Sequence, residues 1–357
     1  MKKISNFDTS LNRKNFNFDV IYKRFEDEND IEYFGRSLGK GAYGEVRDVK
    51  LKNSNKMWAA KLYIKNKDEF PGEVYYPEKL RGPNIVKINK TFEQEINKNT
   101  YELIIMEKAL LRDLGKLSEF YHNHNLLKII DKETFDEGLG NSLLRFYTRQ
   151  IVHSLEALNR NYYVHFDIKP ENLLVTINLE VKLSDFSLLT EVKDKDKLKI
   201  PGGTQGYVSP EYYEKKQISK ETAKKQDYYA LGATLFNLKY GKQMKIRKSD
   251  DNDINNLNIK LLLQKNMADI NSSQVADGDF INFIKCLINY VPEERPSFDQ
   301  IYRNKWLNSD VDIIKQILIL NDSDEEKAIM ELQKSDFLIK MDKNSNKKHK
   351  KFKFKRK

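Results

Sequence analysis

The stretch His165–Asn172 constrains this chain more than any other, because it gathers charged and amide side chains into eight consecutive residues. Asp167 supplies an acid, Lys169 a cation and Asn172 an amide, with a proline-fixed turn between them. An apolar run, Leu173–Val175, follows at once. Polar groups on a loop bounded by strand-like runs are typical of a catalytic loop held by a rigid scaffold. The sequence therefore predicts such a loop between two short strands.

Three side chains of this loop suit phosphoryl transfer. Asp167 can accept a proton from a hydroxyl nucleophile, Lys169 can neutralise a transferring phosphoryl group, and Asn172 can hold a divalent metal through its carbonyl oxygen. The segment resembles the catalytic loop of eukaryotic protein kinases, and Lys169 resembles the serine/threonine branch. The resemblance implies an α+β, bilobal protein kinase fold with a small β-rich N-lobe, a larger mostly helical C-lobe, and the use of ATP and Mg²⁺.

A glycine-rich stretch precedes the loop by more than a hundred residues. Its glycines stand where a backbone must approach phosphates closely. A dinucleotide-binding loop would open a helix, whereas here Val46 continues as a strand toward a second strand-like run, Met57–Tyr63. That order resembles the kinase small lobe, in which Lys61 would pair with the α- and β-phosphates of ATP. By this resemblance the ATP-binding residues are Leu38, Gly39, Gly41, Gly44, Val46, Ala59, Lys61, Met106, Glu107, Ala109 and Leu174, with Met106 as the gatekeeper.

The resemblance assigns Glu73 as the acid that orients Lys61. Pro77 follows Glu73 by one turn, and a proline inside a helix loses a hydrogen bond and clashes with the carbonyl four residues back. We therefore expect either a short, distorted helix around Glu73, or Glu78 or Glu69 as the partner of Lys61.

A metal-binding element is expected after the catalytic loop. Asp185-Phe186-Ser187 resembles the Asp-Phe-Gly element of the family, in which the carboxylate bridges magnesium to the phosphates. Ser187 replaces the glycine, and a serine restricts the backbone freedom that lets this element flip. The activation segment would run from Asp185 to Glu211, with Thr204 close to the catalytic acid and lysine.

Two further residues are predicted to be structural. Asp227 resembles the aspartate at the start of a buried large-lobe helix that braces the catalytic loop. Arg295 matches the arginine that pairs with Glu211 in the family.

Phe166 departs from the family pattern. His165 and Phe166 stand where His-Arg usually precedes the catalytic aspartate. That arginine normally meets a phosphate on the activation segment. The resemblance therefore implies that activation-loop phosphorylation cannot switch this chain through that arginine.

The net charge of +10 belongs mainly to one end of the chain. Residues 346–357 contain eight lysines and arginines and no acid, which leaves about +2 for the rest. This basic tail is expected to bind an import receptor, an acidic lipid or a nucleic acid, or to be simply solvated. No apolar run approaches the length of a membrane span, so we expect an intracellular protein, cytoplasmic or nuclear, that acts on protein substrates.

The predicted domain organisation follows from these boundaries. Residues 110–141 are expected to form a helix plus an insertion. The predicted parts are an N-terminal extension of uncertain order (1–30), a protein kinase domain (31–307, with N-lobe 31–108 and C-lobe 109–307), a short helical extension with helices at 311–320 and 324–332 (308–345), and the basic tail (346–357).

Helical spacing gives two more local predictions. Leu144, Ile151, Leu155 and Leu158 recur at helical spacing, and Asn141-Ser142 is expected to cap that helix. The single cysteine, Cys286, lies in an apolar series and is expected to be buried.

The leading hypothesis is an active serine/threonine kinase that transfers the γ-phosphoryl group of ATP to protein hydroxyls. The alternative is a pseudokinase that acts as a nucleotide-binding scaffold, which the departures at Phe166, Ser187 and Pro77 would favour. A third hypothesis, a nucleic-acid-binding protein, rests on the basic tail alone. Within the kinase family, Lys169–Asn172 and Pro83–Val86 lean toward the calcium/calmodulin-dependent group.

Overall fold

The computed structural model describes residues 3–5, 18–41, 44–65, 80, 82–97, 99–123, 139–176, 178–214, 217–244 and 278–309. The chain divides into two units, residues 1–310 and 311–357, and every described residue belongs to the first. The predicted helices at 311–320 and 324–332 and the basic tail therefore lie outside the described residues. So do Glu73, its alternatives Glu69 and Glu78, and residues 124–138 of the predicted insertion.

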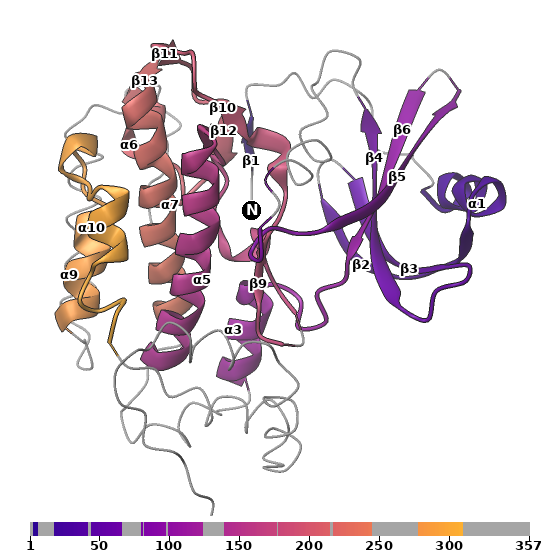
Figure 1. The fold of residues 1–357 in the computed structure, drawn as a ribbon, viewed down its shortest axis with the longest axis horizontal. Helices are drawn as coiled ribbons and strands as arrows, with labels where there is room; N and C mark the ends of the chain where they lie inside the picture. The colour runs from indigo at the N-terminus through magenta and orange to yellow at the C-terminus, as the bar shows by residue number, and fades with distance from the viewer. Residues whose placement is uncertain are drawn as a thin grey trace, which may run out of the picture. The chain divides into compact units, whose positions relative to one another are not determined.

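The first part of the fold is an antiparallel sheet of five strands in the order β2-β3-β4-β6-β5 (Figure 1). The register places Val46 opposite Lys61, and Lys61 opposite Ile104. Because side chains alternate along a strand, one face of the sheet carries Lys61 and the other carries its neighbours Ala60 and Leu62. The strands are β2 (Ile31–Gly41), β3 (Gly44–Leu51), β4 (Met57–Lys65), β5 (Ile88–Ile96) and β6 (Asn99–Glu107).

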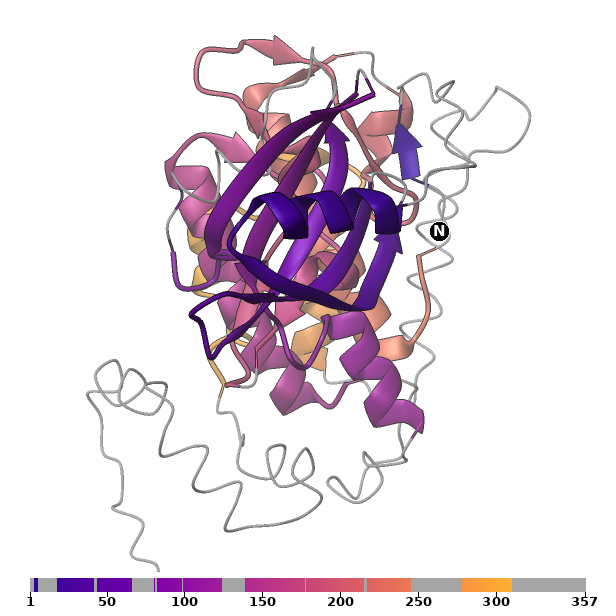
Figure 2. The same ribbon diagram turned by 90° about the vertical axis from the view of Figure 1, so that its right-hand side faces the viewer.

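Helix α1 (Phe18–Glu28) covers the face of the sheet that does not carry Lys61 (Figure 2). Its buried residues Ile21, Tyr22 and Phe25 join Ala60 and Leu62 in one hydrophobic cluster. The prediction that residues 1–30 form an extension of uncertain order was thus wrong for this segment. Its apolar residues recur at three- and four-residue spacing, but charged neighbours interrupt them in the sequence.

The second part of the fold is mainly helical, and α5 and α7 run side by side through it (Figure 1). The predicted helical face of α5 is confirmed, since Leu144, Ile151, Leu155 and Leu158 are all buried. The predicted cap was wrong, because Gly140 is the N-cap residue and no side chain caps the first turn. The helices are α3 (Leu114–Asn123), α5 (Asn141–Arg160), α6 (Pro210–Glu214), α7 (Lys220–Tyr240), α9 (Gly278–Leu287) and α10 (Phe298–Tyr302).

Helix α7 begins two turns before Asp227, so its predicted start at Asp227 was wrong. The side chain of Ser219 accepts a hydrogen bond from the Thr222 amide and caps the helix there. Farther along, Gly232 lets α9 approach closely, because a Cβ at Gly232 would lie 2.8 Å from Cβ of Leu287. Asp227 consequently sits in the middle of a buried helix.

Cys286 lies on the exposed face of α9, and the prediction that it is buried was wrong. The buried face of this helix contains Phe280, Phe283, Ile284 and Leu287. Cys286 instead shares the opposite face with Asn282, four residues earlier.

Short strands and turns connect the helices around the predicted catalytic loop. Their pairs are β7 with β10, β8 with β9, and β11 with β13. In addition, β1 (Lys3–Ser5) pairs antiparallel with β12 in the activation segment. The bounds are β7 (Tyr163–Val164), β8 (Leu173–Val175), β9 (Val181–Leu183), β10 (Thr190–Glu191), β11 (Lys197–Leu198), β12 (Gly202–Thr204) and β13 (Ile218–Ser219), with 3₁₀ turns at Pro170–Asn172, Phe186–Leu188 and Pro292–Glu294.

Across the described ranges, no helix combines the length and the apolar character needed to cross a membrane.

Candidate active site

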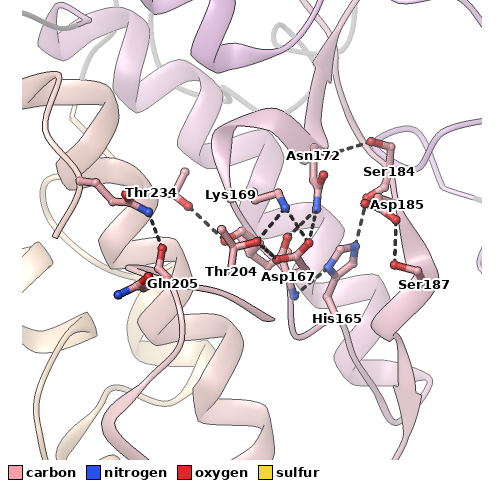
Figure 3. Close-up of polar contacts among 12 residues, drawn as sticks. His165, Asp167, Lys169, Asn172, Ser184, Asp185, Ser187, Thr204, Gln205 and Thr234 are labelled. Atoms are coloured by element: carbon pink, nitrogen blue, oxygen red, sulfur yellow. Dashed lines mark hydrogen bonds and ion pairs between the residues drawn. The ribbon is translucent and has the colours of Figure 1, made fainter. Parts of the chain in front are cut away.

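Asp167 lies at the centre of a group of polar side chains from two separate segments (Figure 3). Its Oδ2 accepts hydrogen bonds from Nζ of Lys169 at 2.8 Å and from Nδ2 of Asn172 at 3.1 Å. Its Oδ1 accepts a 2.6 Å hydrogen bond from the hydroxyl of Thr204, which also accepts one from Lys169. The aspartate is 1% exposed, so its charge is held by these donors rather than by water. The structure therefore joins the predicted acid, lysine, amide and threonine in one cluster.

The β8–β9 hairpin explains why Asn172 and Asp185 come together. Leu173 pairs with Leu183, so the residues just outside the hairpin, Asn172 and Ser184, are neighbours. The Ser184 amide and hydroxyl both donate to the carbonyl oxygen of Asn172, at 3.0 and 3.1 Å. Asp185 is the next residue after Ser184. A three-residue strand pair thus places the two predicted metal ligands at the same end of the hairpin.

Asp227 fixes the backbone of the catalytic loop from α7. Its two carboxylate oxygens accept hydrogen bonds from the amides of His165, at 2.7 Å, and Phe166, at 2.9 Å. Phe166 has a left-handed backbone conformation with φ of 63°, which a non-glycine residue adopts at a cost. Burial raises the pKa of Asp227 to about 7, although both amide donors favour the ionised form. The loop geometry therefore depends on a contact from a distant helix.

His165 links the catalytic loop to the Asp185 element. Its Nδ1 accepts from the amide of Asp167, and its Nε2 lies 3.2 Å from the carbonyl oxygen of Ser184. These contacts assign the neutral tautomer with the proton on Nε2. Burial lowers the pKa of His165 to about 4, because desolvation disfavours the charged ring. The imidazole is consequently an uncharged spacer at neutral pH.

The side chain of Asp185 is held from two directions. The hydroxyl of Ser187 donates a 2.9 Å hydrogen bond to Oδ1 of Asp185, and Nζ of Lys61 lies 3.5 Å from the same oxygen. The Asp185 backbone is left-handed, with φ of 62°. Lys61 reaches this oxygen from the sheet, so the pair connects the two parts of the fold at the site.

One face of the sheet collects the residues predicted to contact the nucleotide. Residues directly opposite each other in an antiparallel pair share a face. The register pairs Val46 with Lys61, Ala59 with Met106, and Gly39 with Val46. Val46, Ala59, Lys61 and Met106 therefore lie on the same side of the sheet, whereas α1 covers the other side.

The donor atoms at the hairpin fit a magnesium ion that also binds phosphates. The part of the chain that the structure describes contains no group of three or more His, Cys, Asp or Glu side chains suited to a metal. Mg²⁺ needs only one or two protein ligands, however, when phosphates and water complete its octahedron. Because the amide nitrogen of Asn172 donates to Asp167, its Oδ1 faces the other way. The amide oxygen of Asn172 and the carboxylate of Asp185 are the kind of oxygen ligands that Mg²⁺ would use at such a site.

All of these site residues lie in the part of the chain that resembles known proteins. A family model described as "Protein kinase domain" matches residues 33–307. The chain belongs to the protein kinase family. The predicted bilobal α+β fold is thereby confirmed, with the five-stranded sheet as the smaller lobe.

Individual relatives are serine/threonine and related kinases of low identity. Serine/threonine-protein kinase MRCK alpha of Mus musculus is 28% identical over 209 residues, which cover 57% of this chain and 11% of that protein. The probable serine/threonine-protein kinase PLK of Dictyostelium discoideum is 24% identical over 299 residues, covering 80% of this chain and 28% of that protein. Rhodopsin kinase GRK1 of Rattus norvegicus is 29% identical over 211 residues, which cover 57% of this chain and 34% of that protein. The chain thus spans about a third or less of each relative.

The kinase family places an arginine where this chain has Phe166, and the structure shows what the phenylalanine does. Its side chain is 1% exposed and belongs to a hydrophobic cluster with Val192, Leu198 and Ile200 of the activation segment. Ile218 of β13 joins the same cluster. The activation segment is therefore held to the catalytic loop by apolar contacts at the position where the family uses a charge.

The far end of the activation segment is anchored by an ion pair. Nη1 and Nη2 of Arg295 donate to the two carboxylate oxygens of Glu211, at 2.8 and 2.6 Å. Both side chains are almost fully buried, and the guanidinium lies 5.0 Å from the ring centroid of Tyr229. The structure thus brings together the pair that the resemblance named.

The remaining predicted nucleotide-binding residues lie on strands around the site. Leu38 and Gly41 lie on β2, Leu174 lies on β8, and Gly44 begins β3. Glu107 ends β6, and its carboxylate accepts a 2.7 Å hydrogen bond from the amide of Lys87.

Two contacts near the site were missed by the sequence reasoning. The hydroxyl of Ser187 binds Asp185, whereas only its backbone effect was considered. Nζ of Lys108, which directly follows β6, lies 2.8 Å from Oδ1 of Asp48. The strand alternation could have found this pair, because Asp48 lies two residues after Val46 and therefore on the nucleotide face.

Proposed function

We propose that this chain is an active protein serine/threonine kinase that transfers the γ-phosphoryl group of ATP to hydroxyls of protein substrates. The observation that carries the proposal is the cluster around Asp167, in which a buried carboxylate is held by Lys169, Asn172 and Thr204. The serine/threonine kinases among the relatives support the same reaction.

Each residue of the cluster has a role that its contacts make feasible. Asp167 would orient the attacking hydroxyl and accept its proton, and two donors on its carboxylate keep the side chain fixed for that task. Lys169 would move its hydrogen bonds from Asp167 and Thr204 to the γ-phosphate. Thr204 would keep the activation segment against the acid.

Nucleotide and metal would be held by residues on both sides of the contact between Lys61 and Asp185. Lys61 would contact the α- and β-phosphates, with Glu73 as its proposed partner. Asn172 and Asp185 would hold Mg²⁺, which neutralises charge on the phosphates when bound. Val46, Ala59 and Met106 would contact the adenine ring on the same face of the sheet.

The test is transfer of labelled phosphate from Mg·ATP to casein and to the chain itself, with the protein made unphosphorylated. Asp167→Asn keeps the size of the side chain and removes the base, so transfer should fall by about a hundredfold or more. Phosphoamino-acid analysis should show phosphoserine or phosphothreonine. A wild-type chain that is stabilised by Mg·ATP in thermal unfolding but transfers no phosphate would overturn the proposal and favour the pseudokinase.

We further propose that activity does not require a phosphate on the activation segment. A buried arginine needs an anionic partner, whereas the apolar cluster around Phe166 is complete without one. The dephosphorylated wild type should therefore transfer phosphate without a lag. Phe166→Leu, which keeps an apolar side chain, should retain this behaviour. A lag that disappears after preincubation with ATP would contradict the proposal.

A further inference from the structure

We propose that helix α1 positions the glycine-rich turn of the nucleotide site, through a contact network that converges on Glu45. The inference rests on the proposed function, which gives the turn its role in phosphate binding. The network joins Asp19 and Tyr22 of α1 to Glu45 and Arg47 of β3 and to Lys40 at the end of β2, beside the turn. Helix α1 precedes the residues matched by the kinase family model.

Tyr22 is the point at which α1 binds the backbone beside the turn. Its hydroxyl donates a 2.8 Å hydrogen bond to the carbonyl oxygen of Glu45, the residue directly after Gly44. Tyr22 is 2% exposed, and burial raises the pKa of its hydroxyl, which therefore remains a donor. Removing this donor would leave a buried carbonyl without its side-chain partner.

The carboxylate of Glu45 connects the network to Lys40, at the end of β2 beside the turn. It is fully buried, and a buried carboxylate requires cationic or hydrogen-bonding partners. Arg47 donates to its Oε2 at 3.1 Å, and Nζ of Lys40 lies 3.4 Å from its Oε1. Lys40 stands between Gly39 and Gly41. The carboxylate of Glu45 thus contacts a residue of β2 that borders the turn.

Arg47 connects this carboxylate back to α1. Its guanidinium contacts the carboxylate of Asp19, and its Cζ lies 4.5 Å from the ring centroid of Tyr22. The arginine side chain is 17% exposed and Asp19 is 70% exposed, so the network runs from solvent to the buried acid.

Strand geometry transmits the position of Glu45 to the nucleotide face. Glu45 and Arg47 point toward α1, so Val46 between them points to the face that carries Lys61. Gly44 is pressed against β4, because a Cβ there would lie 2.1 Å from the carbonyl oxygen of Leu62. The backbone at the end of the turn therefore lies directly against β4. A displacement of Glu45 would displace Gly44 and Val46 together.

The test compares the full chain with Tyr22→Phe, which removes one hydroxyl and keeps the ring. The Kd for Mg·ATP, measured by isothermal titration calorimetry, should rise about two- to tenfold, the range for loss of one hydrogen bond. The KM for ATP should rise by the same factor, whereas kcat and the KM for the protein substrate should change by less than about twofold. Asp19→Asn, at an exposed side chain, should give a smaller rise of up to about fivefold.

Tyr33→Phe is the matched control, because the Tyr33 hydroxyl is exposed and contacts only the sulfur of Met57 among the contacts described. It should leave the Kd unchanged. An unchanged Kd in Tyr22→Phe, or an equal rise in Tyr33→Phe, would overturn the inference. If Tyr22→Phe folds poorly, an unchanged Kd in Asp19→Asn would overturn it instead. The Kd needs no phosphate transfer, so a chain without kinase activity would refute the proposed function and leave this test intact.

Discussion

The hydroxyl of Thr204 donates a 2.6 Å hydrogen bond to Oδ1 of Asp167 and accepts one of 2.8 Å from Nζ of Lys169. It thereby joins the activation segment to both charged groups of the catalytic loop. Thr204→Val keeps the shape of the side chain and removes these hydrogen bonds. We expect kcat to fall by about ten- to a hundredfold, because the acid and the lysine lose their fixed geometry. Steady-state kinetics measure the change.

Thr204→Ser is the control for that prediction, since it restores the hydroxyl without the methyl group. It should recover most of the wild-type kcat. A Thr204→Val enzyme as fast as the wild type would show that the hydroxyl has no role in the reaction.

Asp185 is expected to determine the dependence of activity on magnesium. Asp185→Asn removes the only carboxylate of the proposed metal pair, so transfer should fall by about a hundredfold or more, and higher Mg²⁺ concentrations should be needed. Ser187→Ala removes one 2.9 Å hydrogen bond and keeps the carboxylate, so its effect should be much smaller. Rates measured across a Mg²⁺ titration check both variants. Equal magnesium curves for Asp185→Asn and the wild type would be incompatible with a metal at this site.

The ion pair of Arg295 and Glu211 makes a prediction about stability. Their side chains are 0% and 2% exposed, so removing one partner leaves a buried charge unpaired. Arg295→Met should lower the free energy of unfolding by about 3–5 kcal/mol, measured by urea denaturation. Arg295→Met combined with Glu211→Leu should recover part of this loss, because no charge is then buried. If the double variant lost more free energy of unfolding than the two single variants together, the ion pair would not be the cause of the losses.

His165 predicts how stability depends on pH. Its pKa is about 4 in the folded chain and close to the ordinary 6.5 when unfolded. Between these values the unfolded chain binds more protons, so the free energy of unfolding falls as the pH is lowered from about 6.5 to 4. The histidine accounts for about 3 kcal/mol of this loss.

The measurement is urea denaturation at several pH values for the wild type and His165→Asn. The variant should show a shallower fall of the free energy of unfolding over this range. His153→Asn, at an exposed histidine of α5, serves as the control and should keep the wild-type slope. Parallel curves for His165→Asn and the wild type would contradict the prediction.

The core of the site was predictable from sequence because its parts are held together by short-range structure. Asp167 and Asn172 lie in one loop, and a hairpin of three-residue strands brings Asp185 beside them. Thr204 and Asp227 lie farther along the chain, and they were identified only through the resemblance. Their contacts depend on how α7 and the activation segment pack, which residue spacing does not encode.

The wrong predictions share a physical cause. A helix start depends on which backbone conformation the preceding residue adopts, and Gly140 rather than Asn141 takes the capping position of α5. The burial of Cys286 depends on which face of α9 packs inward, and that face carries Phe280, Phe283 and Leu287 instead. Each outcome is set by the neighbouring element, so local composition is a poor guide to it.

The hydrophobic cluster between α1 and the sheet shows that the folded domain begins before the residues that the family model matches. The match to the kinase family model begins at residue 33, yet Ile21, Tyr22 and Phe25, which precede it, complete the hydrophobic cluster on the sheet. A protein trimmed to the matched residues would expose Ala60, Leu62 and their apolar neighbours to solvent. Exposed apolar patches of this kind promote self-association. We therefore expect a chain trimmed to residues 33–307 to self-associate more readily than one that begins before Phe18.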